Sequence, residues 1–173
     1  DGDTDDDNEC SHNENSGSIT YDLSGNGNHG TINGATSSTP GASNVPVLSV
    51  TSSSNDASYG VGDVIPINIS FGAAVTVSGT PQLTLSTGSS NAVVDYTSGS
   101  GGTTLTFNYT VASGHVSSDL DYASTGALAL NGGTINDANG NAATLTLASP
   151  GASGSLGANK ALVIDGVVPT VTN

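Results

Sequence analysis

Val64-Ile-Pro-Ile-Asn-Ile-Ser-Phe71 is the stretch that decides the fold of this 173-residue chain. Apolar residues recur at every second position from Ile65 to Phe71, and polar residues such as Asn68 and Ser70 lie between them. Successive side chains of a β-strand point to opposite faces of a sheet, so this alternation predicts a strand with one buried face.

Two further segments carry the same alternation. Thr104–Val111 and Lys160–Asp165 place their apolar side chains at alternate positions, namely Leu105, Phe107, Tyr109 and Val111 in the first and Leu162 and Ile164 in the second. No segment longer than ten residues shows the 3.6-residue period of a helix. The sequence therefore predicts an all-β chain.

The expected strands are short and are separated by turn sequences such as Ser98-Gly-Ser-Gly-Gly102 and Asn131-Gly-Gly133. Short strands at a spacing of about 8–12 residues are typical of a β-sandwich or barrel. We predict a sandwich of antiparallel strands over residues 45–167. Its strands are expected at 45–53, 63–71, 74–78, 82–87, 92–97, 103–111, 119–122, 126–130, 143–147 and 160–165.

The composition limits both the core and the partners. Hydrophobic residues make up 34% and aromatic residues 4% of the chain, with no Trp or Met, so the core must be thin and built from Val, Ile and Leu. One Lys or Arg stands against 15 Asp and Glu, for a net charge of −14. Nucleic acids and anionic membranes need basic residues and are poor candidates for partners. The carboxylates must be spread apart, hydrogen-bonded or neutralised by cations.

Cysteine and targeting signals add little. Cys10 is the single cysteine, so it is expected to be free or paired with another chain. Cys10 and His12 lack a second ligand pair, which disfavours a zinc site. No apolar run of 18 residues and no signal peptide is present, so no membrane-spanning segment is expected. The acidic start at Asp1 predicts a processed form or part of a longer polypeptide.

Residues 1–16 form an acidic leader that holds 7 of the 15 acids. Five of these recur at every second position: Asp1, Asp3, Asp5, Asp7 and Glu9. Closely spaced carboxylates repel one another, and a calcium ion with six to eight oxygen ligands relieves that repulsion. Residues 1–10 resemble the aspartate-rich calcium repeats of thrombospondin type 3, whereas Asp6 and His12 do not fit an EF-hand. A calcium site and a solvated acidic leader are the two open interpretations.

Residues 17–44 are expected to form a short strand and a linker. Asp22–Thr36 resembles the opening strand and turn of laminin-G and concanavalin-A-like lectin domains, but this match of 15 residues is too short to imply sugar binding. A strand over 30–35 has no obvious partner and is expected to pair with a sheet edge of this domain or of another subunit. Thr31 and Ile32 are thus candidates for strand exchange.

The domain itself resembles a known family. Residues 59–67, 105–111, 119–135 and 156–165 are similar to tandem immunoglobulin-like repeats of large bacterial surface adhesins, and the resemblance covers about residues 45–167. It implies an immunoglobulin-like β-sandwich, a place outside the cell or on its surface, a role in a fibre or in adhesion, and bound calcium. Two departures remove ligands that the family often has: no Glu follows Phe71, and His115 stands where an Asp is common.

The tail repeats the start of the domain. Val168-Pro-Thr-Val-Thr-Asn173 resembles Val45-Pro-Val-Leu-Ser-Val50, the first predicted strand. The tail is therefore expected to open a next repeat or to be a donor strand for another copy of the protein. Val168 and Val171 are its candidate exchange residues, and copies of the chain are the expected partners.

Acidic residues within the domain are the remaining candidate ligands. Asp119 and Asp121 are two positions apart on one predicted strand face, and Asp165 lies where the chain leaves the domain. Calcium binding and solvated surface both remain open for these three. Asp56 lies near the loop after the first strand, and Asp137 is expected to cap its own turn.

No catalytic site is expected, because the three His lie in polar or Gly-rich contexts and no nucleophile motif is present. The sequence thus predicts a non-enzymatic, extracellular structural or adhesive module stabilised by calcium. A carbohydrate-binding domain that contacts surface glycans and a ligand-free spacer repeat are the alternatives.

Overall fold

The computed structural model describes residues 19–20, 30–31 and 45–168. The chain divides into two compact units, Asp1–Pro40 and Gly41–Asn173, and each is considered by itself.

The first unit contains one small pair of strands. β1 (Ile19–Thr20) pairs antiparallel with β2 (Gly30–Thr31), and Thr31 lies opposite Ile19. The expectation that the strand beginning at residue 30 has no partner of its own is therefore wrong, because a nearby segment of the same unit pairs with it. Ile32 lies outside the described residues, and strand exchange through residues 31 and 32 stays a prediction.

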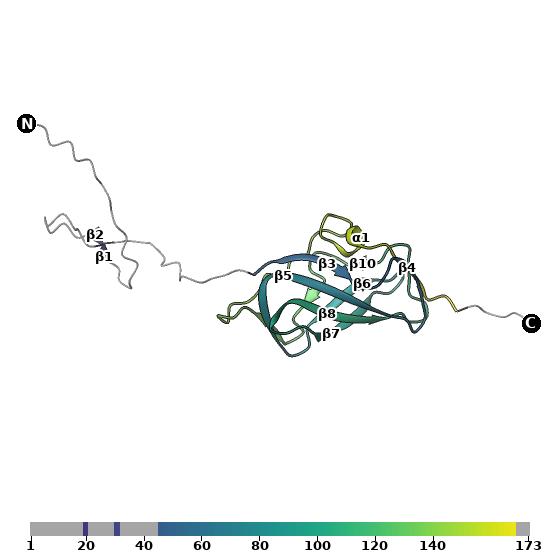
Figure 1. The fold of residues 1–173 in the computed structure, drawn as a ribbon, viewed down its shortest axis with the longest axis horizontal. Coiled ribbons are helices and arrows are strands. Elements are labelled where there is room, and N and C mark those ends of the chain that lie inside the picture. The colour runs from purple at the N-terminus through teal and green to yellow at the C-terminus, as the bar shows by residue number, and fades with distance from the viewer. Residues whose placement is uncertain (1–18, 21–29, 32–44, 169–173) are drawn as a thin grey trace, which may run out of the picture. The chain divides into compact units, whose positions relative to one another are not determined.

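The second unit is built around one large, curled antiparallel sheet (Figure 1). At its centre the neighbouring strands are, in order, β3 (Val47–Ser52), β5 (Val64–Ser78), β8 (Gly102–Thr110) and β7 (Ala92–Ser98). β7 continues the sheet to β6 (Gln82–Ser86), which pairs with β10 (Asp121–Tyr122) and β11 (Leu128–Ala129). The far half of β5 pairs with β12 (Thr134–Asn136).

A smaller sheet joins the first and last parts of the domain. β13 (Leu162–Asp165) pairs in parallel with β4 (Ala57–Gly60) and antiparallel with β9 (Val116–Ser117). The Leu120 N–H donates to the Leu162 carbonyl at 2.8 Å, which places β13 beside the start of β10.

The one described helix is a single turn, α1 (Leu156–Asn159). The Ser155 hydroxyl caps it by accepting the Ala158 N–H at 3.2 Å, and Leu156 is buried. The Asn159 amide donates to the Val50 carbonyl at 2.8 Å, so α1 covers part of the outer edge of β3.

The core consists of the apolar faces that the alternation predicted. Every inward side chain of the three deciding segments is buried, namely Ile65, Ile67, Ile69, Phe71, Leu105, Phe107, Tyr109, Val111, Leu162 and Ile164. The prediction of an all-β fold with short antiparallel strands is confirmed. The parallel pair β4–β13 is an exception that the alternation does not indicate.

Several strand boundaries differ from those expected. The strands predicted at 63–71 and 74–78 are one strand, β5, because an irregularity between Ser70 and Val75 bends it without ending it. The strand predicted at 143–147 is wrong: Thr144 makes an isolated bridge to Pro46, and no ladder forms there. The short strands β4, β9 and β12 were not predicted, because they are too short to show an alternation.

The domain begins beside the middle of β5 and ends near the start of β5. Val47 pairs with Phe71, and the Gly72 N–H donates to the Pro46 carbonyl, whereas the chain leaves beside the turn that follows β8 (Figure 1). Val64, at the start of β5, pairs with Thr110 at that same end. Seven residues of extended strand separate Val64 from Phe71, which corresponds to about 23 Å.

Candidate functional site

Asp119 and Asp121 converge on α1. A methyl group added at Gly157 would lie 3.0 Å from Oδ2 of Asp121 and 3.5 Å from Oδ2 of Asp119. Both carboxylates therefore face the same point, and the missing side chain at Gly157 leaves room for them. The observed strand, β10, includes Asp121 but not Asp119, which lies in a bend before it. Two carboxylates this close repel each other unless hydrogen-bond donors or a cation compensate for the charge.

Backbone N–H groups provide part of that compensation. Oδ1 of Asp121 accepts the Tyr122 N–H at 2.8 Å, and its Oδ2 accepts the Gly151 N–H at 2.9 Å. A carboxylate has about four lone-pair positions, so these two bonds leave acceptor capacity for a cation. The pair is thus chemically suited to a hard cation, with α1 and the loop at residue 151 as its walls.

Asp165 lies apart from this pair. It is the last residue of β13, and its Oδ1 accepts the Val167 N–H at 3.3 Å. Leu162 neighbours Leu120, and Asp165 is three residues further along β13, about 10 Å away. Within the described part of the chain, no group of three or more His, Cys, Asp or Glu side chains is close enough to hold a metal ion. The leader ligands Asp1, Asp3, Asp5, Asp7 and Glu9 lie outside the described residues.

The exit of the chain at Gly166 is held on both sides by the turn at 112–115. The Gly166 N–H donates to the His115 carbonyl at 2.7 Å, and the Gly166 carbonyl accepts the Gly114 N–H at 2.9 Å. A methyl group at position 166 would lie 2.4 Å from the Ala112 carbonyl oxygen and 2.6 Å from that of His115. Only glycine fits this close approach, so the direction in which the chain leaves the domain is set by backbone bonds.

Val45 and Val168, the related residues at the two ends of the domain, differ in their solvent exposure. Val45 is 2% exposed, and its carbonyl accepts the Thr144 N–H at 2.9 Å. Val168 stands at the corresponding place in the tail, but it is 55% exposed. Val61, Val64 and Val167 are exposed apolar side chains in the segments that meet at this exit end. Val171 lies outside the described residues.

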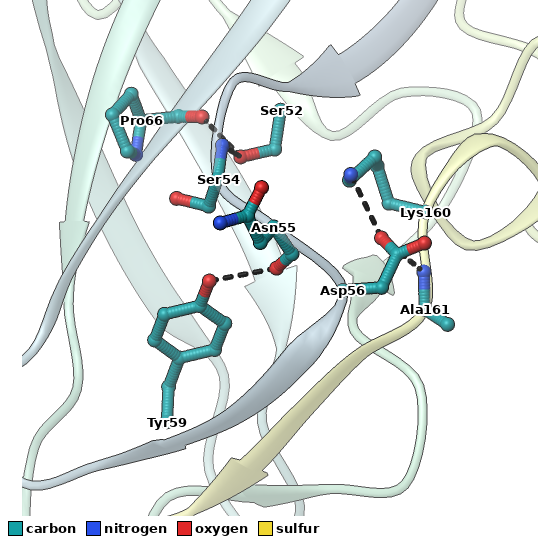
Figure 2. Close-up of polar contacts among 8 residues, drawn as sticks. All are labelled: Ser52, Ser54, Asn55, Asp56, Tyr59, Pro66, Lys160 and Ala161. Carbon is teal, nitrogen blue, oxygen red and sulfur yellow. Dashed lines mark hydrogen bonds and ion pairs between the residues drawn. The ribbon is translucent and has the colours of Figure 1, made fainter.

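Lys160 is the only Lys or Arg of the chain, and it forms an ion pair with Asp56 (Figure 2). Its Nζ lies 2.8 Å from Oδ1 of Asp56, and the same oxygen accepts the Ala161 N–H at 3.2 Å. The Lys160 side-chain hydrogen bond holds the pKa of Asp56 below its ordinary value, with the Ala161 N–H acting in the same direction. No motif around Lys160 indicates this role, although a lone cation in so acidic a chain is a signal for it.

Asp137 caps its own turn, as predicted. Its Oδ1 accepts the N–H groups of Asn139 and Asn141 at 2.8 Å each, and its Oδ2 accepts the Asn141 side-chain amide at 3.0 Å. The Asn141 side-chain bond, followed by the backbone bonds, lowers the pKa of Asp137. These donors provide hydrogen-bond partners for both oxygens of the Asp137 carboxylate, so no cation is needed to stabilise its charge.

An open hollow of about 510 Å³ lies over β7 and β8 and includes Asp95, Asn108 and His115 in its lining. Nδ1 of His115 lies 3.0 Å from the Tyr109 hydroxyl, and the two rings stack. The hollow offers polar groups, but its lining has no Ser or Cys that could act as a nucleophile next to the imidazole.

Comparisons with protein families, with curated proteins and with solved structures find no match to this chain. Of the residues that the structure describes, none belongs to a helix long and apolar enough to cross a membrane. The resemblance to adhesin repeats, the thrombospondin-like leader and the lectin-like segment at 22–36 stay predictions.

Proposed function

We propose that this chain is a non-enzymatic, extracellular structural module that joins copies of itself into a surface fibre or a tandem-repeat adhesin. Its domain is an immunoglobulin-like β-sandwich that bears tension and spaces its neighbours, and it does not catalyse a reaction. Calcium stabilises the module at its clustered carboxylates, and the tail that begins at Val168 opens the next repeat or pairs with another copy.

The neighbour order of the strands supports the immunoglobulin-like assignment. In that fold, strands A, B, E and D form one layer and C, F and G form the other. β3, β5, β8 and β7 are neighbours in the order of strands A, B, E and D. β6, β10 and β13 correspond to strands C, F and G: β6 pairs with β10, and the Leu120–Leu162 hydrogen bond connects the start of β10 to β13.

The observation that carries the proposal is the contrast between Val45 and Val168. The first residue of the repeated Val-Pro sequence is buried in this domain, and the second is exposed at the opposite end of the same domain. Val168 repeats the place of Val45 in the Val-Pro sequence but is exposed, so a second domain of the same fold could bury it as this domain buries Val45. The bonds at Gly166 fix the point at which the chain leaves the domain, two residues before Val168.

The Asp119–Asp121 pair supports the role of calcium. A divalent cation bound there would neutralise two charges of a chain whose formal net charge is −14. Because the cation would bind the folded state and not the unfolded chain, it would raise the melting temperature in proportion to the logarithm of its concentration.

Thermal unfolding of the full chain in millimolar calcium and in chelator tests this role. We expect a higher melting temperature with calcium for the wild-type chain and a smaller gain for Asp119→Asn/Asp121→Asn. Asp95→Asn is the matched control, since its carboxylate is exposed and accepts the Gln82 amide far along β7. Equal melting temperatures with and without calcium would instead favour a ligand-free spacer repeat.

A further inference from the structure

The second strand of the domain, β4, pairs directly with the last strand, β13. β4 lies beside β13 in parallel register, from Ala57 opposite Leu162 to Gly60 opposite Asp165. Of the described strand pairs, this one alone connects the part of the chain that enters the domain with the part that leaves it. The main chain between Gly60 and Leu162 contains strands β5 to β12 and brings the chain back beside β4.

The strand directions determine how this pair responds to tension. β3 runs against β5, and β4 also runs against β5, because the turn at Gly60–Asp63 reverses the chain into β5. Tension applied at Val45 therefore draws β3 and β4 backward along their axes, whereas tension at Val168 draws β13 forward. Since β4 and β13 are parallel, the two forces slide them past each other and load all of their ladder bonds together.

The Asp56–Lys160 ion pair lies where this sliding would act first. Asp56 immediately precedes β4, and Lys160 stands two residues before β13, so sliding of β4 against β13 must carry Oδ1 of Asp56 past its present partners Lys160 and Ala161. The bend that precedes Asp56 is also fixed (Figure 2). The Ser52 hydroxyl donates to the Pro66 carbonyl at 2.7 Å, and the Tyr59 hydroxyl donates to the Asn55 carbonyl at 2.7 Å.

We propose that β4, β13 and the Asp56–Lys160 pair form a tension clamp, which bears load applied between the two ends of the domain. While the clamp holds, force passes from β4 to β13, and the β3–β5 and β13–β9 ladders beside the clamp are loaded with it. This inference goes beyond the proposed function, because it assigns a mechanical activity to named residues of a single domain. We therefore expect Lys160 to affect the lifetime of the domain under force more than its free energy of unfolding without force.

Single-molecule force spectroscopy on the full chain tests the clamp. With the chain held by its two ends at constant force, we expect one opening event that releases roughly 400 Å of chain, at about 3.3–3.6 Å per residue. Forced unfolding is governed by the unfolding rate. Lys160→Gln should shorten the lifetime before opening roughly two- to fivefold, which is the range that an exposed ion pair of this kind supports.

Gln82→Ala is the matched control. It removes the Gln82–Asp95 side-chain bond of 2.8 Å between β6 and β7, a pair of strands outside the loaded ladders. Its lifetime under force should equal that of the wild-type chain. Lifetimes of Lys160→Gln that match those of the wild type, or that shorten no more than those of Gln82→Ala, would overturn the proposal.

The direction of pulling separates a clamp from ordinary stabilisation. Val61 is exposed and follows β4 directly, so a handle on Val61→Cys in a Cys10→Ser background, with the second handle at the C-terminal end, peels β4 from β13 one bond at a time. The chain should open at lower force in this geometry, and Lys160→Gln should change its lifetime little. An equal effect of Lys160→Gln in both geometries would contradict the clamp. Because single chains are measured, a failure to form fibres does not affect this result.

Discussion

Replacing Gly166 by alanine should release the exit of the chain from the domain. The new methyl group would lie 2.4 Å and 2.6 Å from two carbonyl oxygens, of Ala112 and His115, and both belong to backbone that cannot yield without breaking the turn. The Gly166 N–H bond to His115 and the Gly114 N–H bond to Gly166 must then open. At a net value of about 0.5–1.5 kcal/mol for each hydrogen bond, we expect a loss of roughly 1–3 kcal/mol of unfolding free energy.

Urea unfolding followed by circular dichroism measures this loss, and Gly60→Ala is the matched control. Gly60 lies opposite Asp165 at the same end of the domain, but a methyl group there would meet only the Asp165 carbonyl oxygen, at 3.9 Å. We expect Gly60→Ala to stay within about 0.5 kcal/mol of the wild-type chain. Equal midpoints for Gly166→Ala and Gly60→Ala would refute the close approach at the exit and the fixed direction that follows from it.

Three further predictions concern titration and buried hydroxyl groups. The lowered pKa of Asp137 means that the folded state binds its proton less tightly, so this stabilisation is present above pH 3.8 and is lost as the pH falls below that value. Melting curves from neutral pH to about pH 3 should therefore fall less steeply for Asp137→Asn than for the wild type. Burial raises the pKa of Tyr109 and Tyr122 to about 12, so their contribution is complete below pH 10 and should fade toward pH 12, as urea midpoints at alkaline pH will show. Tyr122→Phe removes the 2.7 Å bond to the Ala148 carbonyl and should cost about 1–3 kcal/mol in urea unfolding at neutral pH.

The sequence predicts the core far better than the edges. Residues such as Ile65, Phe107 and Ile164 can be predicted to be buried from their alternation, because a strand with one face in the core has few other arrangements. β4, by contrast, is Ala-Ser-Tyr-Gly, and it is a strand only because β13 lies beside it. Its parallel partner is about a hundred residues away, and no local pattern carries that information.

The candidate site divides in the same way. The sequence indicates the convergence of Asp119 and Asp121 by their spacing of two residues, but Asp119 lies in a bend before β10, so the strand alternation that suggested it is not its cause. The bonds around Gly166 and the partner of Lys160 depend on segments that meet only after folding. Asp56 illustrates the difference: its place near the loop after the first strand did not indicate a partner, and its carboxylate contacts Lys160 and Ala161 just before the last strand.

Assembly of the full chain is the most direct test of the account. Electron microscopy and sedimentation of the purified protein, in millimolar calcium and in chelator, report whether copies join and whether calcium orders them. We expect elongated assemblies with calcium, fewer or more flexible ones in chelator, and loss of assembly on Val168→Asp. Discrete monomers of unchanged shape under both conditions would contradict the proposed structural module.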